Sequence, residues 1–174
     1  MPRRAIPEVH AQDHVEGSNN ATVTLVEYGD FECPYSAEAV MTVQRLRTHL
    51  GDDLRFVYRH FPLVHKHPHA FRAAEASEAA GRQHQFWSMY HRLFASQHAL
   101  SERDLFRYAA DLDLEMAQFS REMTEDTYAA RIQADRQEAE RSGVNGTPTF
   151  FINGILYEGK DTFEALLEAI QSMS

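Results

Sequence analysis

Cys33 is the only cysteine in this chain of 174 residues, and its surroundings in the sequence suit a chemical role. It follows an apolar segment, Thr22–Tyr28, and stands directly before Pro34, where a helical pattern begins. At the start of a helix, unpaired backbone N–H groups and the helix dipole favour an anion. We therefore expect a thiolate at Cys33 that attacks disulfides, and the hydroxyl of Ser36, one turn into the helix, can donate a hydrogen bond to it.

Two observations oppose this interpretation. Asp30 and Glu32 lie close to Cys33 in the sequence and disfavour a thiolate if their side chains point inward. A single cysteine is also often no more than a small, buried apolar residue. The cysteine count excludes an internal disulfide and a structural zinc site built from several thiolates.

The segments around Cys33 have the pattern of a strand, a helix and a second strand. Thr22–Tyr28 is almost continuously apolar, with Glu27 as its one ionisable residue, which is typical of a strand buried on both faces. Apolar residues recur at helical spacing from Pro34 to Gly51, and Leu54–Phe61 alternates like a strand. The short connections predict a βαβ unit with parallel strands.

A helical period then extends from about Pro68 to Ser142, and Ser101 with Asp104 marks the start of one helix within it. A last helix of this block is predicted from about Asp126 to Arg141. The aromatic residues Phe86, Trp87, Tyr90 and Phe94 are interpreted as a helix face in the core rather than a peptide groove, with Trp87 the better candidate for surface contact.

The β pattern returns at Gly143. Asn153–Gly154 between two apolar runs is a strong hairpin signal, because a type I′ turn needs positive φ at both positions. Asp161–Met173 closes the chain as a helix. A hairpin alone is marginally stable, so both β parts must share one sheet. The fold class is therefore α/β, a mixed sheet (βαβ + ββα) with an inserted helical block.

Thr147–Pro148 stands at the start of a predicted strand, where an X–Pro bond is a candidate for the cis form. Taken with Cys33, it carries a family resemblance. The segment EYGDFECPY at 27–35, a helical block, and GVNGTPTFFING at 143–154 resemble, in the same order, the DsbA-like branch of the thioredoxin superfamily. The resemblance extends from about Val15 to the C-terminus.

The resemblance implies a single thioredoxin-like domain over residues 1–174, with its core at about 15–62 and 143–174 and a helical insertion at about 63–142. It implies a solvent-accessible nucleophile at Cys33 that faces a cis Thr147–Pro148 bond. Glu27 corresponds to the family's buried acid beneath the site, although a carboxylate that reaches solvent at the strand end is an equal alternative. The residues assigned to substrate binding are Pro34, Tyr35, Thr147 and Pro148.

One position departs from the family pattern. The family normally carries CxxC, and Ser36 stands where the second cysteine would be. A serine can neither resolve a mixed disulfide nor store an oxidising equivalent. We therefore expect a thiol–disulfide oxidoreductase of reductase or isomerase type that acts through one cysteine, or the serine form of a dithiol enzyme. Its partners would be protein or peptide thiols and disulfides, with glutathione or another thiol as co-substrate and no bound cofactor.

Two other functions are open on the same fold. Some relatives are glutathione-dependent transferases or isomerases, in which the first serine of a Ser-Pro-Tyr-Ser motif activates glutathione; here Cys33 takes that position. The other alternative is a non-enzymatic binding module, which a Cys33 of normal, slow thiol reactivity would favour.

Composition narrows the partners and the location. A net charge of −9 argues against nucleic-acid binding, and no apolar run reaches the roughly 20 residues of a membrane span. Residues 1–20 lack the apolar run of about 7–15 residues that a secretory signal needs. We expect a cytoplasmic protein, or an extracytoplasmic one if a signal has been removed.

Four histidines, at positions 60, 65, 67 and 69, are dense enough to suggest a metal site. However, Pro68 separates the last two, and no cysteine or carboxylate stands at ligand spacing. We interpret this segment as a loop that leads into a helix beginning at Pro68, and we predict no metal ligands.

Overall fold

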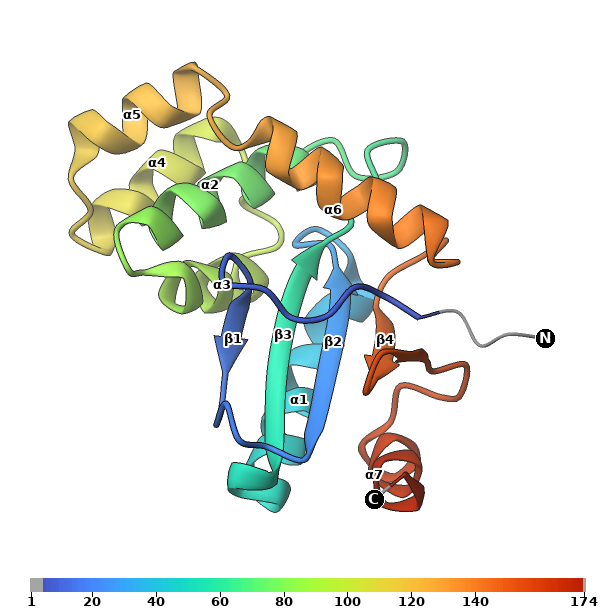
Figure 1. Ribbon diagram of the computed structural model, residues 1–174. Coiled ribbons are helices and arrows are strands. Elements are labelled where there is room, and N and C mark those ends of the chain that lie inside the picture. The colour runs from blue at the N-terminus through green and yellow to red at the C-terminus, as the bar shows by residue number, and fades with distance from the viewer. Residues whose placement is uncertain (1–4, 174) are drawn as a thin grey trace.

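A computed structural model describes residues 5–173, so positions 1–4 and 174 of the expected domain lie outside the described residues. Its centre is a five-stranded mixed sheet in the order β1-β3-β2-β4-β5 (Figure 1). The elements are β1 (His14–Glu16), β2 (Val23–Gly29), α1 (Pro34–Leu50), a 3-10 helix (Gly51–Asp53), β3 (Leu54–His60), α2 (Ala70–Arg82), α3 (Phe86–Ala95), α4 (Glu102–Asp111), α5 (Met116–Thr124), α6 (Ala129–Arg141), β4 (Thr149–Ile152), β5 (Ile155–Leu156) and α7 (Phe163–Ser172).

The predicted sheet is confirmed. β2 and β3 are parallel and joined through α1, and β4 pairs antiparallel with β2, so that Tyr28 lies opposite Thr149. Asn153 and Gly154 have φ values of 49° and 79°, as the predicted hairpin turn requires. β1, which the sequence did not reveal, adds three residues antiparallel to β3.

Helices α2 to α6 lie between β3 and β4 in the chain; α2, α4, α5 and α6 gather beyond the carboxyl ends of β2 and β3, and α3 lies lower, near β1 (Figure 1). The capping box of Ser101 and Asp104 at the start of α4 is confirmed. The predicted helix start at Pro68 was wrong, because Pro68 lies in a turn and α2 begins at Ala70. The helix predicted from about Asp126 is α6, which begins at Ala129 because Asp126, with a φ of 50°, lies in the turn after α5. Helix α5 was not predicted.

Two apolar clusters pack around the sheet. The larger joins β2 and β3 to α1 and the helical block, and it includes the buried rings of Phe86, Tyr90 and Phe94. The core interpretation of this aromatic face is therefore confirmed. Trp87 packs on Phe56 but is only partly buried, so it is the most exposed of the four rings, in agreement with its choice as the better candidate for surface contact.

Candidate active site

Cys33 lies where β2 turns into α1, as predicted. It is the N-cap residue of α1, with Pro34 in the first turn, and its N–H donates to the carbonyl of Asp30 over 3.1 Å. Gln97, from the segment after α3, donates to the carbonyls of both Phe31 and Cys33 over 2.9 Å. This amide holds the loop around Cys33, and sequence reasoning missed it because a lone glutamine in a connecting segment carries no signal.

The Thr147–Pro148 bond is cis and lies against Cys33. The pairing of β4 with β2 brings the two segments together, and the thiol of Cys33 donates to the Thr147 carbonyl over 3.5 Å. The hydroxyl oxygen of Thr147 is buried without a hydrogen-bond partner among the described residues. The two motifs that carry the resemblance therefore form one site.

The thiol is less accessible than the resemblance implied. Cys33 is only 3% exposed, which corrects the expectation of a solvent-accessible nucleophile. The reason is that its sulfur turns toward the Thr147 carbonyl and away from the surface that Pro34 and Tyr35 form, where Tyr35 is 67% exposed. Cys33 is also one of the residues that line a cavity at this site.

That cavity, of about 440 Å³, has a basic lining. Lys66 and the neighbouring histidines come from the loop after β3, and Arg136 comes from α6, far away in the sequence. Such groups attract carboxylates. The lining residues are Cys33, Pro34, Tyr35, Leu63, His65, Lys66, His67, Arg136, Asn145, Gly146 and Thr147.

The two acids beside Cys33 are paired with histidines of that loop. Asp30 is buried, and its carboxylate accepts hydrogen bonds from the N–H groups of Glu32 and Leu63 and lies 2.8 Å from Nδ1 of His67. The Glu32 carboxylate lies 3.1 Å from Nδ1 of His69. Both acids therefore have partners other than the sulfur, which reduces their effect on a thiolate.

Ser36 is fully buried, and its hydroxyl oxygen accepts a hydrogen bond from the N–H of Asp30 over 3.3 Å. This contact fixes the loop that precedes Cys33. The hydrogen bond that the structure describes for Ser36 thus holds the backbone, and its expected donation to the sulfur stays a prediction.

Glu27 lies beneath the site in the middle of the sheet. It is fully buried, and neither carboxylate oxygen has a hydrogen-bond partner among the described residues. Burial, with a smaller contribution from the charge of Asp161, raises the pKa of Glu27 to about 8. The alternative of a carboxylate that reaches solvent was therefore wrong, because β3 and β4 flank this position on both sides.

Comparisons with known proteins agree with this geometry. The family Thioredoxin_4, described as thioredoxin, matches residues 10–172. A thioredoxin-like oxidoreductase from Silicibacter pomeroyi is 28% identical, with a TM-score of 0.83 over 94% of this chain and 93% of that one. BdbD from Bacillus subtilis is 21% identical, with a TM-score of 0.82 over 98% and 96% of the two chains.

Curated relatives are described as Na(+)/H(+) antiporters. The antiporter NhaA 1 of Salinispora arenicola is 46% identical over 167 residues, and that of Mycolicibacterium vanbaalenii is 42% identical over 163 residues. These matches cover 96% and 92% of this chain but 26% of each relative, so the chain spans about a quarter of their length. Among residues 5–173, no helix is long and apolar enough to cross a membrane.

Proposed function

This chain belongs to the thioredoxin family and has the fold of its DsbA-like members, and from that premise we propose that it exchanges thiols and disulfides through Cys33 alone. The Cys33 thiolate attacks a protein–glutathione disulfide, forms a disulfide with the glutathione sulfur and releases the protein thiolate. A second glutathione thiolate then attacks that disulfide, frees Cys33 and leaves as oxidised glutathione. The substrate is reduced and glutathione is oxidised.

One observation carries this proposal. The sulfur of Cys33 lies at the start of α1, against the Thr147 carbonyl, and the residue Cys33 also lines the basic cavity. A substrate strand that hydrogen-bonds the backbone at Thr147 would displace the thiol from that carbonyl and bring its own disulfide to the sulfur. With Ser36 in the second position, release depends on a free thiol, and we propose the glutathione-rich cytoplasm as the compartment.

Replacing Cys33 with serine tests the proposal. We expect the glutathione-dependent reduction of a glutathionylated peptide to fall to the uncatalysed rate, because a hydroxyl does not form the mixed disulfide. Circular dichroism and the melting temperature of Cys33→Ser establish that the variant is folded. A folded variant that retains the wild-type rate would show that the proposal is wrong.

The basic cavity supports glutathione or an acidic peptide as the group bound beside Cys33. We expect Lys66→Gln and Arg136→Gln each to raise the KM for a glutathionylated peptide by about 3- to 5-fold, because each removes one positive charge from the cavity lining. Lys160→Gln, an exposed lysine outside the cavity, is the matched control. The difference in KM between each cavity variant and the wild type should vanish at high salt, because salt screens the charges. An equal rise in KM for an uncharged disulfide would contradict a role for charge.

A second candidate function is a non-enzymatic binding module. The burial of Cys33 favours it, as do the antiporter relatives, in which the matching segment is a minor part of the chain. The alkylation rate of Cys33 separates the two. A rate in the folded protein below that of the urea-unfolded chain at neutral pH would favour the binding module, whereas a faster rate would favour the enzyme.

A further inference from the structure

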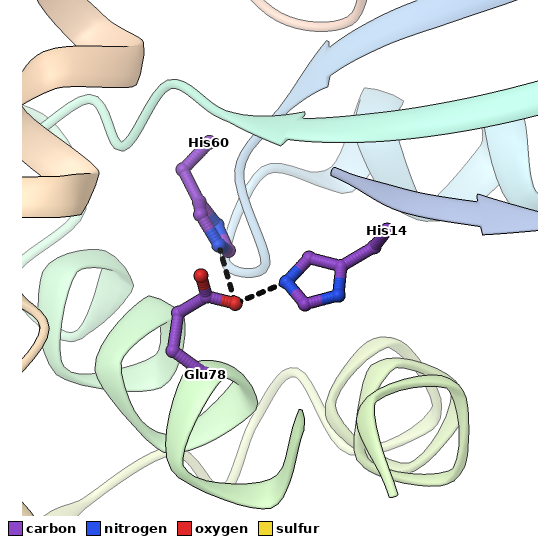
Figure 2. A group of neighbouring side chains, drawn as sticks. All are labelled: His14, His60 and Glu78. Atoms are coloured by element: carbon purple, nitrogen blue, oxygen red, sulfur yellow. Dashed lines mark hydrogen bonds and ion pairs between the residues drawn. The ribbon is translucent and has the colours of Figure 1, made fainter. Parts of the chain in front are cut away.

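Away from the thiol, three side chains from separate elements meet at one point. His14 of β1, His60 at the end of β3 and Glu78 of α2 turn toward one another (Figure 2). One ligand atom of each, two imidazole nitrogens and a carboxylate oxygen, lies within 4.8 Å of the others. It is the one such group of histidine, cysteine and acidic residues found within residues 5–173, and it does not include the histidines of the loop beside Cys33.

His60 has a buried imidazole whose hydrogen-bonding capacity is unused by the described residues. His60 is 1% exposed, and neither ring nitrogen has a hydrogen-bond partner among the described residues. A buried polar group without a partner costs free energy. Its Nε2 faces Oε2 of Glu78 at 3.6 Å, which is too long for a hydrogen bond but leaves both atoms directed at the same space.

The other two groups are prepared to bind a cation. Nε2 of His14 contacts the same oxygen of Glu78, and the His14 ring stacks on Phe86 with centroids 3.5 Å apart, which fixes its orientation. Glu78 is itself buried, and its two carboxylate oxygens face different partners, Arg131 at Oε1 and His14 at Oε2.

We propose that His14, His60 and Glu78 bind a divalent transition-metal ion, with Zn²⁺ as the best match. Two imidazoles and one carboxylate are a known ligand set for this ion, with a fourth position left for water. In such a site the ligand atoms lie about 2.0–2.2 Å from the metal. Binding requires the three ligand atoms, which lie within 4.8 Å of one another, to adjust to these distances from a common centre.

The surroundings accommodate such an ion. The guanidinium of Arg131 contacts Oε1 of Glu78, which leaves Oε2 for the metal. Asp135 accepts a hydrogen bond from the N–H of His60 over 3.0 Å and places a second acid nearby to offset the positive charge of Arg131. An outer partner such as Arg131 orients the carboxylate ligand, whereas Asp135 fixes the backbone of His60. The ion would join β1 to β3 and to α2 and so stabilise the packing of the insertion on the sheet.

Binding of Zn²⁺ and Co²⁺ to the full chain tests the site. Titration calorimetry should show one equivalent of Zn²⁺ bound, and Co²⁺ should give visible absorption without the charge-transfer band of a thiolate ligand. Zn²⁺ should also raise the melting temperature of the chelator-treated protein. His14→Gln should weaken binding by at least about 10-fold and abolish the thermal shift. His98→Gln, an exposed histidine elsewhere, is the matched control and should bind as the wild type does.

Specific outcomes would overturn the proposal. One is the absence of saturable Zn²⁺ and Co²⁺ binding. Another is binding that persists in His14→Gln but disappears in His65→Gln or Cys33→Ser, which would place the ion beside the thiol. Glu78→Gln also loses the Arg131 contact and is prone to misfold, so the decisive variant is His14→Gln, whose partly exposed ring lies on an edge strand.

Discussion

Replacing Ser36 with cysteine is expected to turn the protein into a dithiol oxidase. Residue 36 lies one turn after Cys33 on α1 and is fully buried beside the same loop. With oxidised glutathione as the oxidant, a second thiol there attacks the mixed disulfide between Cys33 and glutathione, releases reduced glutathione and leaves a disulfide between positions 33 and 36, which a dithiol peptide then reduces while being oxidised itself. Intramolecular attack has a large advantage over attack by an external thiol, so we expect the oxidation of a reduced dithiol peptide to accelerate by on the order of 10²-fold.

Mass spectrometry after treatment with oxidised glutathione checks this expectation. Ser36→Cys should lose two hydrogens and carry no glutathione, whereas the wild type should carry one glutathione on Cys33. Glu38→Cys is the matched control, because position 38 is exposed and points away from Cys33 on the helix. If Ser36→Cys carried glutathione on both thiols and gained no oxidase activity, position 36 would not be the place of a resolving cysteine.

Replacing Glu27 with glutamine is expected to remove a large pH dependence of stability. Burial and Asp161 raise the pKa of Glu27 from 4.5 to about 8. Between these values the folded protein holds a proton that the unfolded chain has lost, so the free energy of unfolding falls as the pH rises. This stabilisation is complete below pH 4.5 and lost by pH 8. At about 1.4 kcal/mol for each pH unit, the difference is roughly 5 kcal/mol.

Urea unfolding of wild type and Glu27→Gln from pH 4.5 to 9 measures this contribution. Other groups with shifted pKa values, such as Asp13 and Asp135, titrate in both proteins, so the difference between them isolates Glu27. The difference should move in favour of the variant as the pH rises and level off above pH 8. Glu158→Gln, an exposed acid, should run parallel to the wild type. A constant difference for Glu27→Gln would mean that Glu27 is ionised throughout.

The sequence alone determined where Cys33 and Thr147–Pro148 stand relative to the helix and strands of the site, because the signals for these positions are local. A continuous apolar strand, proline in the first turn of α1 and Asn153–Gly154 each act within a few residues of chain. Together they place Cys33 at the start of a helix and Thr147–Pro148 at the start of a neighbouring strand. Strand β1 escaped prediction because three residues are too few for a period to show.

Only the tertiary structure decided which side chains surround Cys33 and Thr147–Pro148. The pairing of Asp30 with His67 and of Glu32 with His69 spans 37 residues in each case, so no spacing rule could reveal it. Arg136 of α6 is likewise far from Cys33 in the sequence, and only the packing of α6 places it in the cavity lining.

The burial of Cys33 also depended on the fold, because the Thr147 carbonyl that accepts from its thiol lies 114 residues away in the chain. The cluster of His14, His60 and Glu78 shows the limit most clearly. The local density of histidines in the sequence groups His60 with those at 65, 67 and 69, whereas the residues that face His60 in the fold come from β1 and α2. The sequence specifies the chemistry of each side chain, but the packing of helices and strands determines which side chains meet in a buried space.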